Sequence, residues 1–155
     1  VDLLRPNGIM MIGLYSEIAR QPIVAGRSLI AEKGYTTSPE DIRRCRQVII
    51  SKANDGNLEL AQICNYRDFF GVSMCRDLLF HVQEHHFTIP KIEANLQDLG
   101  LKFLGFELKD QAVRKRFEEF HPGKTARSTL SFWNKFETEN PGVFFSMYQF
   151  WVQKI

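Results

Sequence analysis

The sequence lacks a long hydrophobic run, a long basic run and any C-x-x-C pair of cysteines. No apolar stretch approaches the roughly 18 residues that would suggest a membrane span, and no segment has the layout of a signal peptide. The net charge is only +2, which argues against an electrostatic footprint for nucleic acid. The three cysteines are an odd number, which argues against a disulfide framework. We therefore expect a soluble cytoplasmic protein that binds neither membranes nor nucleic acid.

The residues that are present have the ordinary composition of a globular domain, with 44% apolar and 25% charged residues, and we expect one domain over 1–155. Segment 9–15 is a continuous apolar run, which is typical of a strand covered on both faces of a parallel sheet. Segments 101–108 and 147–154 also have the composition of strands, and 38–99 has helical spacing. The predicted fold is α/β, with a small three-stranded mixed sheet and a helix-rich insertion at 38–99.

Short polar residues in front of the helical patterns predict where the helices begin. We expect helix caps at Ser16, Ser38, Ser73, Thr88 and Asp110.

The segment LLFHVQEHHF contains the pattern H-x-x-E-H between His81 and His85, which is the signature of inverted zinc proteases. A catalytic zinc needs a third protein ligand, and Glu137 and Glu139 are candidates only because they are acidic. The helix is also expected to end near Glu84, because HFTIP supplies a new helix start. We therefore place a zinc hydrolase third among the possible functions and expect no metal.

Two other interpretations of this segment are open. In the first, His81 is a half-buried helix residue that packs beside Leu78 and Val82. In the second, the segment has a substrate-side role in catalysis, as the following resemblance suggests.

Three segments carry a resemblance to a known family. LLRPNGIMMIGLYS resembles the fifth strand of class I S-adenosylmethionine-dependent methyltransferases with its preceding turn, and LQDLGLKFLGFEL resembles the sixth strand with the helix end before it. MYQFWVQK resembles the seventh strand, which is antiparallel in that family. More narrowly, CRDLLFHVQEHHFTIPKIEANLQDLGLKFLGFEL and FETENPGVFFSMYQFWVQK are similar to bacterial members in which tetratricopeptide repeats precede the methyltransferase domain. The resemblance covers nearly the whole chain.

The family's cofactor motif is missing from this sequence. The family binds S-adenosylmethionine with a Gly-rich strand-helix turn, roughly G-x-G-x-G, and an acidic residue at the end of the next strand. The closest glycine pairs here are 8/13 and 100/105, and neither forms this motif. The resemblance thus implies the C-terminal, acceptor-side portion of a Rossmann-like methyltransferase. The cofactor would be S-adenosylmethionine in the intact parent, none would bind to this chain alone, and the chain would be inactive in isolation.

The resemblance also implies candidate residues for contact with the methyl acceptor, although the acceptor and its atom type are unknown. The carboxyl end of the first strand is where α/β sheets bind ligands, and the insertion of this fold overhangs the cofactor's methyl group. The candidates at these two places are Tyr15, Ser16, Glu17, His81, Gln83 and Glu84. Ser16 has the equally weighted alternative of acting only as a helix cap.

A function from another class is a non-catalytic protein-binding or regulatory module that uses the helical insertion.

The family's fourth strand normally pairs with the fifth on the side away from the seventh. The absence of a fourth strand from this chain predicts an unpaired apolar edge at the first strand, and therefore a homodimer or other self-association.

A group of aromatic residues near the C-terminus is expected to form the core rather than a base-stacking platform: Phe132, Trp133, Phe136, Phe144, Phe145, Tyr148, Phe150 and Trp151.

Overall fold

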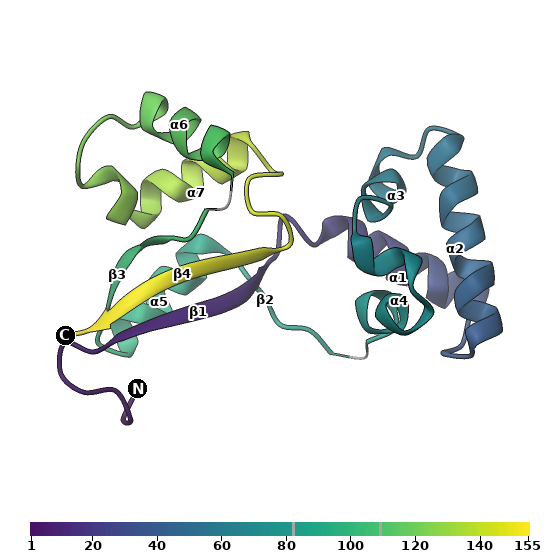
Figure 1. Ribbon diagram of the computed structural model, residues 1–155, viewed down its shortest axis with the longest axis horizontal. Helices are drawn as coiled ribbons and strands as arrows, with labels where there is room; N and C mark the ends of the chain where they lie inside the picture. Colours follow the sequence, from purple (N-terminus) through teal and green to yellow (C-terminus); the bar gives the residue numbers. More distant parts are fainter. Residues whose placement is uncertain (82, 109) are drawn as a thin grey trace. The chain divides into compact units, whose positions relative to one another are not determined.

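The computed structural model describes residues 1–81, 83–108 and 110–155, which form four β-strands and seven α-helices (Figure 1). The strands are β1 (Ile9–Ser16), β2 (His86–Phe87), β3 (Leu101–Phe106) and β4 (Met147–Lys154). The helices are α1 (Gln21–Lys33), α2 (Pro39–Asn54), α3 (Leu58–Ile63), α4 (Val72–Leu79), α5 (Ile89–Asp98), α6 (Gln111–Phe120) and α7 (Leu130–Glu139). Two short 3₁₀ helices cover Arg67–Phe70 and Ala126–Ser128.

The chain forms two compact units, each with its own hydrophobic core. The sheet unit comprises Val1–Ala19 and His85–Ile155, and the helical unit comprises Arg20–Glu84. The helices expected over 38–99 are divided between them, because α2, α3 and α4 belong to the helical unit and α5 belongs to the sheet unit. The assignment of 1–155 to one domain stays a prediction.

The sheet has four strands in the order β2-β1-β4-β3, and not the three that the sequence predicts. β4 is antiparallel to both of its neighbours, and β2 runs parallel to β1. The extra strand β2 is only two residues long, which is too short for any hydrophobic pattern. The strand expected over 101–108 ends at Phe106.

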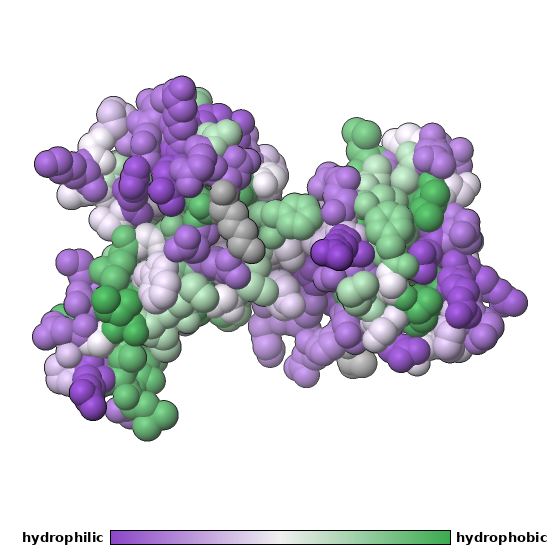
Figure 2. All heavy atoms as spheres, viewed as in Figure 1, coloured by the Kyte–Doolittle hydropathy of each residue, from purple (hydrophilic) through white to green (hydrophobic). Residues whose placement is uncertain are grey.

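β1 is covered on one face only in this chain, so the prediction that both of its faces are covered is wrong here. Met10, Ile12 and Leu14 pack against the core, whereas Ile9 and Met11 are 56% and 52% exposed. The exposed side therefore stays apolar, and Figure 2 shows apolar residues gathered near the two chain termini, where β1 begins. The apolar run thus predicted the strand but not what covers it.

Aromatic residues dominate the core of the sheet unit. The ring of Phe106 lies 4.5 Å from that of Phe144 and 5.3 Å from that of Trp133, measured between centroids. α5 packs against β3 and α7, and in Figure 1 it lies behind the sheet. The aromatic group predicted from the sequence is mostly core, but Phe132, Phe145 and Trp151 are 40%, 62% and 40% exposed.

The helical unit packs around fully buried side chains from all four of its α-helices, among them Ile23, Ile42, Ile63 and Cys75. A Cβ atom added at Gly26 would lie 2.8 Å from Ile63 Cδ1, so the glycine allows α1 and α3 to approach closely.

The three cysteines are free thiols. Cys45 and Cys75 are buried and Cys64 is half-buried. Burial raises the pKa of Cys45 to about 12 and that of Cys75 to about 11, so both thiols stay protonated and pack as small apolar groups. No helix of the described residues has the length and hydrophobicity needed to cross a membrane.

Three of the predicted helix caps are confirmed: the side chains of Ser38, Thr88 and Asp110 each accept a backbone hydrogen bond at the start of a helix. Two are wrong. α1 begins only at Gln21, where Pro22 can occupy the first turn, and the Ser16 hydroxyl accepts from the Ala19 amide in a turn before it. α4 begins at Val72, one residue before the predicted cap Ser73.

Candidate functional site

The carboxyl end of β1 is held by backbone hydrogen bonds from both sides. On one side, the Ser16 amide donates to the Ser146 carbonyl at 3.1 Å. On the other side, the Glu17 amide donates to the Phe87 carbonyl at 2.9 Å, next to the pairing of Tyr15 with His86 in β2. The backbone that carries Tyr15, Ser16 and Glu17 is therefore fixed on both edges.

A buried carboxylate sits beneath this strand end. The Ser16 hydroxyl donates to Glu137 Oε1 at 2.8 Å, and the Tyr148 hydroxyl donates to Glu137 Oε2 at 2.7 Å. Ser16, Glu137 and Tyr148 are 0%, 1% and 0% exposed. We call these three residues the Glu137 cluster. The three residues come from β1, α7 and β4, so the hydrogen bonds between their side chains join these three elements.

The electrostatics of the cluster follow from its burial. Burial raises the pKa of Glu137, and the hydrogen bonds from Tyr148 and Ser16 act in the opposite direction because they stabilise the charged form. Burial also raises the pKa of Tyr148, so the phenol keeps its proton and remains a hydrogen-bond donor. The carboxyl group is therefore more easily protonated than an exposed glutamate.

The cluster positions the strand end and does not itself meet a ligand, because all three of its side chains are buried. The neighbouring residues differ: Tyr15 is half-buried and Glu17 is exposed. A phenol and a carboxylate on a rigid strand end can orient a ligand by hydrogen bonds, and the carboxylate can accept a proton.

Sequence reasoning missed the Glu137 cluster, although the pattern contained a signal. Glu137 lies four residues after Trp133 and seven after Leu130, so it shares the apolar face of α7. A carboxylate at such a position must be buried with partners, since burying it alone is costly. Tyr148 alternates with Phe150 and Val152 on the buried side of β4, and its hydroxyl is a natural partner.

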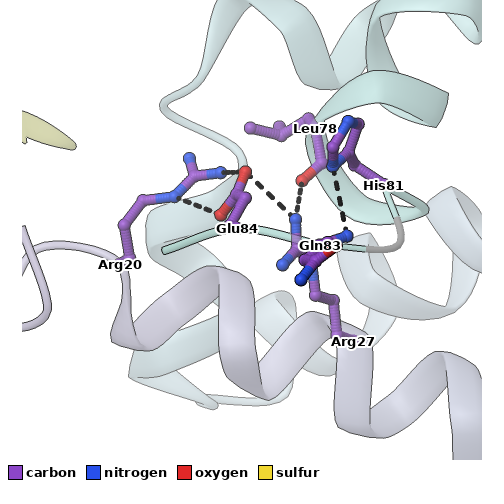
Figure 3. Close-up of polar contacts among 6 residues, drawn as sticks. All are labelled: Arg20, Arg27, Leu78, His81, Gln83 and Glu84. Carbon is purple, nitrogen blue, oxygen red and sulfur yellow. Dashed lines mark hydrogen bonds and ion pairs between the residues drawn. The ribbon is translucent and has the colours of Figure 1, made fainter. Parts of the chain in front are cut away.

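The candidate Glu84 is committed to arginines of the helical unit. Its carboxylate accepts from Arg20 Nε at 3.2 Å and from a second guanidinium nitrogen of Arg20, and it forms an ion pair with Arg27 at 3.1 Å (Figure 3). Arg27 also donates to the Leu78 carbonyl at 3.3 Å. The Arg20 and Glu84 side chains are only 3% and 6% exposed. The ion pairs of its buried carboxylate therefore give Glu84 a structural role.

The H-x-x-E-H segment is not helical in the described residues. α4 ends at Leu79, earlier than the predicted end near Glu84, so His81 and His85 do not share a helix face. His81 is exposed rather than half-buried, and its Nδ1 accepts from the Gln83 amide at 3.3 Å (Figure 3). Val82, the other neighbour predicted for His81, lies outside the described residues. Over 1–81, 83–108 and 110–155, no three His, Cys, Asp or Glu side chains converge as metal ligands would.

The predicted site residues thus fall into two sets. Tyr15, Ser16 and Glu17 belong to the sheet unit, whereas His81, Gln83 and Glu84 belong to the helical unit. In comparisons with known proteins, no family model matches this chain and no curated protein matches it significantly.

Proposed function

We propose that this chain is the C-terminal, acceptor-side portion of a class I S-adenosylmethionine-dependent methyltransferase. The observation that carries the proposal is the order of its strands. β4, which resembles the antiparallel seventh strand, lies directly beside β1, which resembles the fifth, and the two are antiparallel over seven pairs from Ile9 to Tyr15. Two strands that are neighbours in the sheet but far apart in the sequence define a specific topology. The resemblance implies the same topology, with the seventh strand beside the fifth.

The residues present do not form a site for S-adenosylmethionine. A Gly-rich turn between a strand and a helix lets the backbone approach a nucleotide-like ligand. The connection from β1 to α1 is Glu-Ile-Ala-Arg and that from β3 to α6 is Glu-Leu-Lys-Asp, and neither contains glycine. We therefore assign no cofactor contact and no chemical step to this chain.

The contribution that we assign to the chain is positioning of the methyl acceptor. Tyr15 and Glu17 flank Ser16 at the carboxyl end of β1, the end at which α/β sheets bind their ligands. The Glu137 cluster below them fixes the backbone from which both project. Orientation of this kind contributes strongly to group transfer, because a rigidly held acceptor needs less ordering in the transition state.

We expect the chain alone to bind no S-adenosylmethionine in titration calorimetry and a longer product of the same gene to bind it. In that longer protein, Tyr15→Phe should lower the transfer of tritiated methyl groups into a desalted cell extract by up to about a hundredfold, the loss that misplacing a bound reactant can cause. Its affinity for the cofactor should be unchanged. Tyr35→Phe, the same chemical change in the helical unit, is the matched control. Micromolar cofactor binding by the chain alone would contradict the proposal.

A second candidate function is a protein-binding module in the helical unit. It is favoured by the separate core of Arg20–Glu84 and by two apolar side chains exposed on its surface, Phe70 and Met74, which are 55% and 45% exposed. Such a module would bind its partner through Phe70 and Met74 and would be indifferent to changes at Tyr15.

We also propose that the chain self-associates through β1. On the side away from β4, β1 pairs with β2 only at Tyr15 and Ser16, so within the described residues the edge from Ile9 to Leu14 has no strand beside it. The edge carries no charge and no proline, the features that usually prevent edge pairing. Antiparallel pairing of two copies about a twofold axis would satisfy it.

The expected result is that Met11→Lys raises the dissociation constant of the dimer at least about tenfold, because edge lysines oppose strand pairing. Sedimentation velocity at several concentrations measures the change. Met74→Lys, on α4 and similarly exposed, is the control and should leave the dimer intact. A chain that is monomeric at every concentration would exclude pairing through β1.

A further inference from the structure

The sheet unit contains an open cleft of about 450 Å³ that none of the Glu137 cluster residues line. Its walls are mostly apolar and include Ile9, Leu104, Phe106, Leu108, Trp133 and Trp151. This volume lies within the roughly 300–1,000 Å³ that is usual for small-molecule sites. The cleft therefore has the size and the apolar walls of a binding site.

A β-bulge shapes one wall of the cleft. The pairing of β3 with β4 shifts register between Phe103 and Gly105, so the bulged strand bends there. Gly105 has φ +153°, a conformation that other residues rarely adopt. A Cβ atom added at this glycine would lie 3.7 Å from the Arg127 carbonyl oxygen, which is an ordinary contact, so the backbone conformation and not a lack of space favours glycine here.

The indole donors that face this region are already satisfied. The Trp133 N–H donates to the Arg127 carbonyl at 2.9 Å, and the Trp151 N–H donates to Glu107 Oε2 at 3.1 Å. Trp133 is also held rigidly by its stack on Phe117, with ring centroids 3.5 Å apart. Trp151, which is 40% exposed, thus offers apolar surface to a ligand and not a hydrogen bond, whereas Trp133 is only 2% exposed and contributes little accessible surface.

Among the residues that the structure describes, the charged side chains that line the cleft are Arg114 and Arg127. Arg127 pairs with Glu118. Arg114, which is half-buried on α6, has no carboxylate within ion-pair distance in the part of the chain that the structure describes. Both of these side chains are cationic, and the Arg114 guanidinium has no ion-pair partner among the described residues. The cleft therefore favours an anionic group on its ligand.

We propose that this cleft binds a small molecule with a flat apolar body and a single carboxylate. The body would lie against Trp151 and the other apolar walls, where aromatic contacts favour a planar ring. The carboxylate would face Arg114, whose planar guanidinium matches a carboxylate with two parallel hydrogen bonds. This ligand site is separate from the acceptor end of β1 and does not depend on the methyltransferase proposal.

Nuclear magnetic resonance gives a direct test, because the chain has only two tryptophans and both line the cleft. The probes are 2-naphthoate and its neutral analogue 2-naphthamide, added to ¹⁵N-labelled chain. Both indole N–H resonances should shift on addition of 2-naphthoate. Its dissociation constant should be about tenfold lower than that of 2-naphthamide, since hydrogen bonds to charged groups are worth more than neutral ones.

Arg114→Gln should raise the dissociation constant of 2-naphthoate to that of 2-naphthamide. Lys115→Gln is the matched control: it removes a cation from the same helix, but Lys115 is 81% exposed and does not line the cleft, so affinity should hold. The proposal is overturned by the absence of indole shifts at millimolar 2-naphthoate. Equal affinity for the two probes would overturn it as well, and that comparison needs no variant. An unchanged affinity in Arg114→Gln would exclude Arg114 as the anion partner.

Discussion

Replacing Glu137 by leucine should lower the free energy of unfolding of the sheet unit by about 4 kcal/mol, because two buried hydroxyl groups would lose their acceptor at roughly 1–3 kcal/mol each. Those groups are the hydroxyls of Ser16 and Tyr148, which lie 2.8 and 2.7 Å from the carboxylate. Neither hydroxyl can turn to water, since both residues are fully buried. Denaturation followed by tryptophan fluorescence reports on this unit selectively, because Trp133 and Trp151 both belong to it.

Two further variants separate the lost hydrogen bonds from a loss of packing. Glu137→Gln keeps an amide oxygen as acceptor and should cost less than about 1.5 kcal/mol, the net worth of one hydrogen bond. Adding Tyr148→Phe to Glu137→Leu should restore part of the loss, since it removes one of the two unsatisfied hydroxyls. If Glu137→Leu were as stable as the parent, the cluster would not hold the end of β1.

The same residue gives the sheet unit a pH dependence. The pKa of Glu137 is raised in the folded protein from its usual value of 4.5, so the folded state binds the proton more tightly than the unfolded state. Its contribution to stability is therefore fully present below pH 4.5 and is lost as the pH rises through the folded-state pKa. The difference in stability between the parent and Glu137→Gln, measured from pH 4 to 8, should follow this course. A difference that does not change with pH would contradict it.

Replacing Glu84 by alanine should destabilise the helical unit by about 3–5 kcal/mol, the usual cost of leaving one member of a buried ion pair behind. Glu84 compensates the guanidinium of Arg20, whose side chain is 3% exposed, and it also pairs with Arg27. The helical unit contains no tryptophan. Loss of its structure should therefore appear as an earlier transition in far-ultraviolet circular dichroism than in tryptophan fluorescence.

The matched control is Glu118→Ala, which breaks the exposed pair with Arg127. Those two side chains are 43% and 54% exposed, so the change should cost no more than about 1 kcal/mol. The double change Arg20→Met with Glu84→Leu should recover part of the stability lost in Glu84→Ala, because the Arg20 charge is no longer buried without a partner, although Arg27, whose side chain is 23% exposed, still loses its ion pair. Equal transitions in the two spectroscopic signals for Glu84→Ala would show that the ion pair does not hold this unit together.

Local sequence patterns predicted the elements that depend on interactions between residues close together in the chain. The strand over 147–154 was predicted with its observed bounds, because the segment contains aromatic residues and a β-branched valine, which favour strands. The caps at Ser38, Thr88 and Asp110 were predicted because a side-chain oxygen a few residues away satisfies the first amides of a helix.

Predictions failed where the deciding contact came from a distant part of the chain. β2 exists only because Phe87 reaches the end of β1, more than 70 residues earlier. The H-x-x-E-H pattern suggests two histidines on one helix face, but α4 ends before the pattern begins and Glu84 turns to Arg20 instead. The alternative in which Ser16 is only a cap does not anticipate its bond to Glu137, which lies 121 residues away.

The sequence by itself determined the types of the longer elements, the free cysteines and the absence of a Gly-rich turn, since each depends on residues close together in the chain. The tertiary structure alone decided that one face of β1 stays open and that the chain divides into two cores. It also decided which carboxylates are buried. Burying Glu137 and Glu84 is tolerable only where hydroxyls or guanidinium groups from other elements converge on them, and that convergence is a property of the packed chain.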